Sequence, residues 1–326
     1  MKIIKNRILL LVLILLPFIS VANDDDQPKG NAIIQIFSNF HTGLFEQNDI
    51  RGFEMDRCYL GYEYKLNSGL SAKAVMDIGA PAATTDDYNR LAYIKFAQIS
   101  WTRNNFNLQA GIIPTLLFGT QDKFWGYRYI MQSVQGEYKF GNSADLGIST
   151  SYKIADWISA DAIIVNGEGY KKIQKKNGLL YGLGTTIEPL KGMIIRLYAN
   201  INEDAARLNN TTNYAMLLGY KNKTFSIGAE YNMVRNLKFI ANNDKEALSV
   251  YGTLFLGEKN KLFARVDKIE SLNELYQADD EIGIILGSEF KIGRYINLSP
   301  NFRMYIPAEN NLNNKYMLYL SARFNI

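Results

Sequence analysis

The chain has 326 residues, of which 47% are hydrophobic and 13% aromatic, with 36 Lys and Arg against 32 Asp and Glu. The single histidine and the single cysteine exclude a histidine-based metal cluster and an intramolecular disulfide. The modest formal charge of +4 gives no indication of nucleic-acid binding.

Residues 1–22 have the pattern of a secretory signal peptide. Basic residues precede a short apolar run at residues 8–16, and Ser, Val and Ala at 20–22 form a small-residue cleavage site. The apolar run is shorter than the roughly 18 residues of a membrane-spanning helix. Three of the 36 cations and none of the acids leave with this peptide, so the remaining chain is close to neutral. The polar residues 23–32 then read as a periplasmic leader.

From Ile33 onward, apolar and polar residues alternate, which is typical of β-strands with one apolar face. The alternation is clearest at residues 70–79, 225–233, 248–256 and 315–326. Tyr and Phe are abundant, with 21 and 17 residues, as the aromatic belts of a membrane barrel require. A secreted, soluble all-β protein is the alternative.

Short turns and longer polar links alternate between the predicted strands. The longer links are expected at residues 46–52, 80–89, 114–142, 167–178, 203–212, 236–244, 272–278 and 307–313. Outer-membrane barrels have short periplasmic turns and longer external loops. The sequence therefore predicts that residues 33–326 form an all-β, transmembrane antiparallel β-barrel of about 16 strands in a bacterial outer membrane, with both termini in the periplasm. An even number of strands closes the barrel without an unpaired edge, which lipid would not tolerate.

Two positions conflict with this scheme. Pro300 falls within a predicted strand, on its lipid-facing side, where proline cannot donate to the ladder, so we expect a bulge or a shifted boundary there. Residues 131–140 could form an additional strand, which would change the strand count.

The link at residues 114–142 is the longest and is the third external loop in the predicted order. We expect it to fold into the lumen and narrow it. Lys123 and Arg128 would then lie at the narrowest point, where two donors would bind a phosphate-like anion. Four aromatic residues of the loop would anchor it to the wall: Phe124, Trp125, Tyr127 and Tyr129. In the alternative, the aromatics only fix the loop and the two cations pair locally.

A barrel of this size is wide enough for an aqueous channel, so its lining decides what it does. On the predicted inward face, cations outnumber acids, which favours a mild preference for anions. The candidate cations there are Arg57, Lys73, Lys95, Arg196 and Arg265. In the alternative, most of these charges form cross-strand ion pairs, for example Arg57 with Glu63.

Enzymatic hypotheses find little support. His41 is the only histidine, and Gly43 stands two residues later, where a barrel lipase would need Ser. The acidic residues 279–281 lie near a loop end and are more simply explained as solvating groups. We therefore predict no catalysis, no cofactor and no metal.

Four fragments, taken in order along the chain, carry a family resemblance: residues 53–64, 123–129, 143–147 and 165–170. In these fragments the chain resembles the porin family of Bacteroidetes-type bacteria that is related to the phosphate-selective porins O and P. The resemblance covers nearly the whole mature chain. It implies an outer-membrane barrel of about 16 strands, a homotrimer, and passage of small anions such as phosphate. The ending departs from the common pattern of such barrels, because the last aromatic residue is Phe324 and Ile326 follows it.

Two functions are compatible with these observations. The first is an outer-membrane porin, a passive diffusion channel for small anionic or neutral solutes with a mild preference for anions such as phosphate. The second is a barrel plugged by residues 114–142 that serves as a structural or surface-interaction protein. In both, outer-membrane lipid surrounds the barrel and no nucleic acid takes part.

Overall fold

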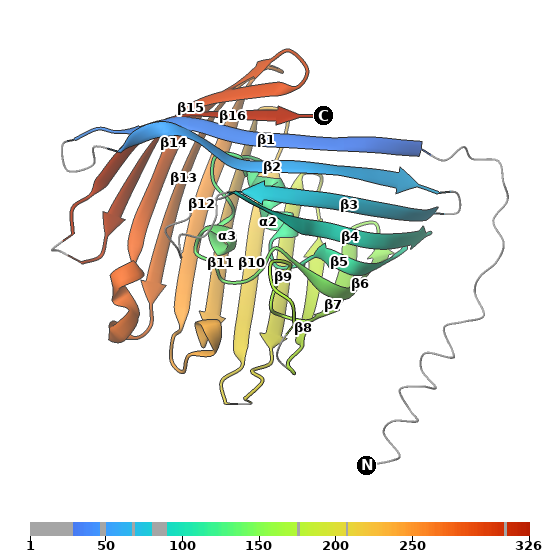
Figure 1. Cartoon of the computed structure of the whole chain (residues 1–326). Helices are drawn as coiled ribbons and strands as arrows, with labels where there is room; N and C mark the ends of the chain where they lie inside the picture. Colours follow the sequence, from blue (N-terminus) through green and yellow to red (C-terminus); the bar gives the residue numbers. More distant parts are fainter. Residues whose placement is uncertain are drawn as a thin grey trace, which may run out of the picture.

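The computed structural model describes residues 29–45, 50–66, 69–79, 90–174, 177–206, 208–309 and 312–326. The predicted signal peptide lies outside them. The described residues form one closed antiparallel sheet in which each strand pairs with its neighbours in sequence, and β1 (Lys29–Gly43) closes the ring with β16 (Lys315–Asn325). Figure 1 shows this ring of strands. The predicted barrel and its strand count are therefore confirmed.

The remaining elements follow in chain order. The strands are β2 (Arg51–Lys65), β3 (Leu70–Gly79), β4 (Leu91–Arg103), β5 (Phe106–Pro114), β6 (Ala144–Ala155), β7 (Ile158–Val165), β8 (Leu180–Ile187), β9 (Met193–Asn202), β10 (Thr211–Lys221), β11 (Phe225–Arg235), β12 (Lys245–Leu256), β13 (Asn260–Ser271), β14 (Glu281–Ile292) and β15 (Ile296–Pro307). The helices are α2 (Gly119–Trp125), α3 (Val134–Glu137), and the 3-10 helices η4 (Leu237–Phe239) and η5 (Glu274–Asp279). Within the described parts of the chain, no helix is long and apolar enough to cross a lipid bilayer.

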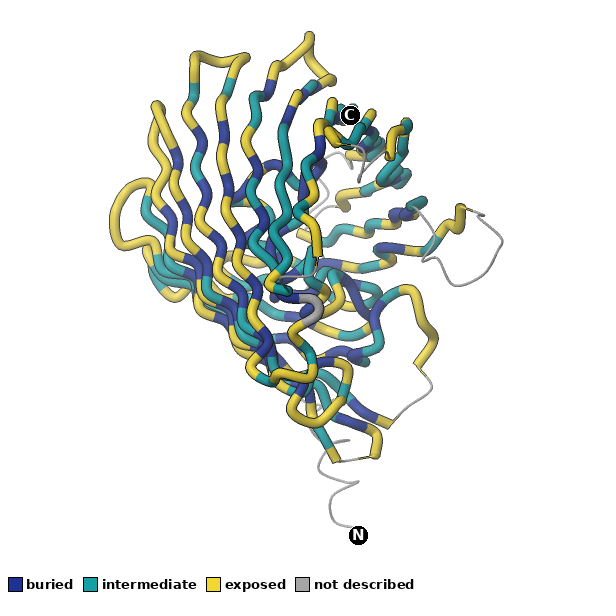
Figure 2. Tube along the Cα trace, turned by 90° about the vertical axis from the view of Figure 1, so that its left-hand side faces the viewer, coloured by how far each residue is buried: buried dark blue, intermediate teal, exposed yellow. Residues whose placement is uncertain are grey.

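Burial alternates along the strands, as Figure 2 shows. On β12, Leu248 and Val250 are about half exposed, whereas Ser249 and Tyr251 are buried. Successive side chains of a strand point to opposite faces, so a period of two places one apolar set outside and one mixed set inside. The outer surface of the barrel is accordingly apolar, and the polar and charged side chains gather within it.

Pairs of aromatic residues lie where short turns join the strands. Tyr220 and Phe225 flank the turn between β10 and β11, with ring centroids 5.8 Å apart. The ring centroids of Tyr295, just before β15, and Phe324, near the end of β16, lie 6.3 Å apart on the same rim. Aromatic rings near the rim of a membrane barrel fit the interface between lipid chains and water.

The strand boundaries correct two expectations. β1 begins at Lys29, which pairs with Lys65 of β2, so residues 29–32 of the predicted leader belong to the first strand. Residues 131–140 do not form an additional strand, because α3 and irregular backbone occupy them. The link between β5 and β6 therefore spans residues 115–143.

No bulge forms at Pro300. The register between β14 and β15 is the same on both sides of it, since Gly287 pairs with Asn301 and Phe290 with Leu298. Proline lacks an N–H, so the ladder simply omits pairs at this point. Register shifts occur instead between β1 and β2, between β3 and β4, and between β6 and β7.

Candidate functional site

Residues 115–143, called here the inner segment, contact the inward side chains of strands all around the barrel. Tyr129 lies against Phe37 of β1, and Trp125 against Tyr251 of β12. Gln135 donates a hydrogen bond to Asn232 of β11 at 2.5 Å. Only a segment within the ring can reach strands so far apart, and Figure 1 shows α2 and α3 there.

The sequence explains why the segment folds back on itself. α2 ends at Trp125 and is capped by Gly126, whose backbone is left-handed with φ 79° and whose N–H donates to the carbonyl of Asp122 at 3.0 Å. Glycine adopts this conformation without steric cost. The carboxylate of Asp122 then accepts the N–H of Ser133 at 2.9 Å, which closes a compact loop.

The four aromatic residues predicted to anchor this segment all contact the wall. The Trp125 ring lies 6.0 Å and the Tyr127 ring 4.5 Å from Phe263 of β13. The hydroxyl of Tyr129 donates to Glu289 at 2.9 Å. Phe124 lies over the β10 backbone, where a Cβ at Gly219 would collide with its ring.

Three consecutive carbonyl oxygens, of residues 130–132, each accept a hydrogen bond. Their donors are Arg303 at 2.8 Å, the indole of Trp125 at 2.9 Å and Arg265 at 2.6 Å. Arg265 also pairs with Asp267 at 2.7 Å, and both side chains are buried. Arg265, which was predicted to line the lumen as a free cation, is therefore neutralised by Asp267 and holds the inner segment.

Arg196 is neutralised in a similar way. It forms a buried ion pair with Asp161 of β7, across Gly184 of β8, which leaves room for the two side chains. Arg57 pairs with Asp77 at 2.5 Å rather than with Glu63 as the sequence suggested. The choice of partner depends on strand register, which alternation alone does not provide.

The other predicted cations come together on the opposite side of the inner segment. Lys73, Lys95, Lys123 and Arg128 line one cavity of about 300 Å³ between α2 and strands β1 to β5, called here the cationic cavity. Among the residues that the structure describes, no carboxylate lies within ion-pair distance of the three lysines. The cavity therefore carries uncompensated positive charge.

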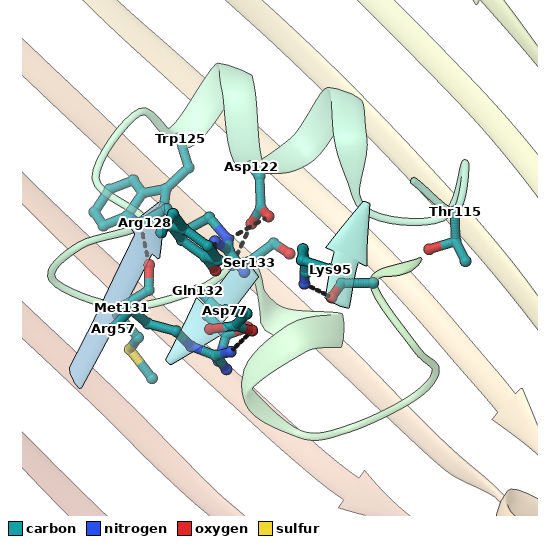
Figure 3. Close-up of polar contacts among 12 residues, drawn as sticks. Arg57, Asp77, Lys95, Thr115, Asp122, Trp125, Arg128, Met131, Gln132 and Ser133 are labelled. Carbon is teal, nitrogen blue, oxygen red and sulfur yellow. Dashed lines mark hydrogen bonds and ion pairs between the residues drawn. The ribbon is translucent and has the colours of Figure 1, made fainter. Parts of the chain in front are cut away.

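Two cations of this cavity, Arg128 and Lys95, form hydrogen bonds with neighbouring side chains (Figure 3). Arg128 pairs with Asp122 at 3.0 Å and donates to the hydroxyl of Tyr59 at 2.9 Å. Burial alone would lower its pKa, but Tyr59 and Asp122 outweigh this and the pKa lies above its ordinary value. Lys95, which is buried, donates to Ser143 at 2.5 Å.

Residues 166–174, called here the arm, cover this region from the link between β7 and β8. The carboxylate of Asp145 accepts the N–H groups of Gly167 at 2.7 Å and of Gly169 at 3.1 Å. Both glycines have positive φ, 88° and 85°, which allows the tight turn. Two of the fragments that carry the family resemblance, residues 143–147 and 165–170, are thus joined through one carboxylate.

The arm places Tyr170 beside the cations. Its hydroxyl donates to Asp77 at 2.5 Å, and its ring lies 4.3 Å from the ammonium of Lys95. Lys171 follows, and burial together with repulsion by Arg57 lowers its pKa. Tyr170 and Lys171 are not among the predicted site residues, although the fragment that contains Tyr170 was a usable signal.

No protein-family model and no curated protein matches the chain. Solved structures do match it in fold. OmpF of Salmonella typhi, in complex with daunomycin, gives a TM-score of 0.73 at 12% identity, over 94% of this chain and 100% of that one. An anion-selective porin from Comamonas acidovorans gives 0.67 at 10% identity, over 92% and 100%. OmpT of Vibrio cholerae gives 0.64 at 15% identity, over 94% and 100%.

The fold is therefore that of the bacterial outer-membrane porins. The finer resemblance to the phosphate-selective porins O and P stays a prediction. In the described parts of the chain, no group of three or more His, Cys, Asp or Glu side chains could hold a metal ion.

Proposed function

We propose that the protein is an outer-membrane porin, a passive channel for small solutes that favours anions such as phosphate. The observation that carries the proposal is the cationic cavity, where Lys73, Lys95 and Lys123 face a common space beside the inner segment. Elsewhere on the inner face, charges such as those of Arg196 and Arg265 are compensated by carboxylates.

The physical basis of the preference is local. An ion in a narrow passage responds to the charges that line it, and not to the net charge of the protein. A phosphate dianion also gains charge-assisted hydrogen bonds from ammonium and guanidinium groups, which are stronger than bonds between neutral groups. The apolar outer face of the barrel supports a position in lipid, with the short turns on the periplasmic side.

Single-channel recording in planar bilayers tests the proposal. We expect steady open steps, a reversal potential shifted toward that of chloride under a salt gradient, and a reduced chloride current when phosphate is added. Lys123→Gln and Arg128→Gln should both weaken the anion preference, since each removes one positive charge from the cavity. Lys259→Gln, in the exposed turn between β12 and β13, is the matched control and should change little.

A second function is favoured by one observation. A hydrophobic cluster runs from β1–β3 through Trp125, Tyr127 and Tyr129 of the inner segment to strands β10 and β12–β14, so the segment bridges the lumen. A barrel plugged in this way would serve as a structural or surface-interaction protein. Well-folded protein that shows no conductance would favour the plug and reject the channel.

The proposal extends to a homotrimer. OmpT of Vibrio cholerae is described in a trimer form, and its fold is similar to that of this chain at 16% identity. The apolar outer wall offers lipid-facing surface for such contacts. Native mass spectrometry of the detergent-extracted protein measures the assembly directly, and a monomer would contradict this extension.

A further inference from the structure

The cationic cavity is not lined by charge alone. Phe96 and Phe118 line it together with the lysines, and Ile33 and Val75 add aliphatic surface. An apolar lining does not help to bind inorganic anions, because it offers a hydrated phosphate no hydrogen bonds.

A β-bulge brings the Phe96 ring to this position. On the ladder with β3, Val75 pairs with Phe96 and Met76 with Ile94, so Lys95 is an extra residue without a partner. Strict alternation would send the side chains of Lys95 and Phe96 to opposite faces. Both instead line the cavity, since a bulge can re-aim a side chain.

The bulge thus creates a paired cationic and aromatic surface. The ammonium of Lys95 lies 5.9 Å and that of Lys73 lies 5.4 Å from the centre of the Phe96 ring. A carboxylate could bind these ammonium groups while a flat apolar body packs against the ring. The cavity, at about 300 Å³, has room for a small molecule of this kind.

We propose that the cationic cavity is a binding site for small organic anions with a flat apolar body, such as aromatic carboxylates. The inference rests on the proposed function and names the class of solute that the passage binds most strongly. Lys73, Lys95 and Lys123 supply the charge, and Phe96 discriminates between an aromatic and an aliphatic or inorganic anion.

The test compares benzoate, acetate and inorganic phosphate by isothermal titration calorimetry on the folded, detergent-solubilised protein. Benzoate should bind about tenfold more tightly than acetate, which corresponds to about 1.4 kcal/mol. Phe96→Ala should remove most of this preference, and Lys95→Gln should weaken both carboxylates. Phe96→Leu, which keeps apolar volume without a flat ring, serves if the alanine variant does not fold, and should also reduce the preference.

Phe255→Ala is the matched control. Phe255 also has a lysine over its ring, with Lys221 at 5.5 Å, but it lies near the turn end of β12 and does not line the cavity. This variant should keep the preference for benzoate. Equal affinities for benzoate and acetate, or a preference that survives Phe96→Leu and Phe96→Ala, would overturn the inference.

Recording in bilayers separates this inference from the proposed function. Anion-selective currents without a preference for benzoate in calorimetry would reject the binding site and leave the channel standing. Silent bilayers with an intact benzoate preference that depends on Phe96 would reject the channel and establish the site in a closed barrel.

Discussion

The guanidinium of Arg303 donates a hydrogen bond to the carbonyl oxygen of Ile130 at 2.8 Å. This bond joins β15 to the inner segment, beside the one from Arg265. Arg303 forms no ion pair with a carboxylate of the described residues, so its replacement breaks no ion pair in that part of the chain.

Arg303→Met should therefore loosen the inner segment without unfolding the barrel. A hydrogen bond from a charged group contributes about 1.5–3 kcal/mol. We expect brief current fluctuations in single-channel records and faster proteolysis within residues 115–143. Arg294→Met, which removes an arginine lying over Tyr295 at the turn between β14 and β15, is the control. Identical current noise in both variants would contradict a role for Arg303 in holding the segment.

Asp145→Asn should release the arm. The carboxylate accepts two backbone N–H groups there, from Gly167 and Gly169, and an amide can replace only part of this. With about 1.5–3 kcal/mol for each bond to a charged group, we expect faster amide hydrogen exchange across residues 166–174. Asp156→Asn, at an exposed turn, is the control. Unchanged exchange in the arm would show that other contacts hold it.

Gly184→Ala should destabilise the barrel. A Cβ at this position would lie 2.6 Å from Asp161 and closer still to Arg196, so the buried ion pair has to shift. Overpacking of this kind costs about 1–3 kcal/mol. The measurement is the urea midpoint of the folded band in gel electrophoresis. Gly252→Ala, where a Cβ would meet only a carbonyl oxygen at 3.4 Å, should be neutral.

Anion preference should rise on acidification through Glu137. Burial raises the pKa of this carboxyl above its ordinary 4.5, although the positive charges of Arg265 and Arg303 oppose the rise. The nearby carboxylates of Asp267 and Glu281 add to it. With its pKa raised, Glu137 loses its charge at a higher pH than an exposed glutamate does. Protonation then removes a negative charge from the inner segment, which favours anions.

The check is the reversal potential in a salt gradient, recorded from neutral pH down to 4.5, the ordinary pKa of a glutamate. Glu137→Gln should flatten this change, because the variant has no proton to gain there. Glu258→Gln, in the exposed turn between β12 and β13, should keep the pH dependence of the natural chain. If Glu137→Gln and the natural chain respond alike, other groups carry the effect.

The barrel could be predicted from the sequence because lipid and lumen impose opposite demands on adjacent residues of a strand. Residues 248–256 already show this alternation, and the structure places Leu248 and Val250 outside as expected. The alternation of short turns and long links provided the topology. Pro300 shows the limit, because the strand accommodates it by omitting ladder pairs rather than by a bulge.

The site was harder to predict, since it depends on register between strands. Arg196 and Lys95 look equivalent in the sequence as inward cations, yet Arg196 faces Asp161 and Lys95 faces no carboxylate partner among the described residues. The shift at Lys95 arises from an extra residue that pattern counting does not detect. Which cations remain uncompensated therefore follows only from the three-dimensional structure.

The residues that line the cationic cavity and the residues that hold the inner segment come from different parts of the chain. Every residue that lines the cationic cavity lies between Ile33 and Ser143, whereas Arg265 and Arg303, which hold the segment, come from β13 and β15. On the proposed function, solute preference and loop retention are thus encoded in separate stretches of sequence. Exchange of the first stretch between related barrels would transfer the solute preference, while Arg265 and Arg303 would still hold the inner segment.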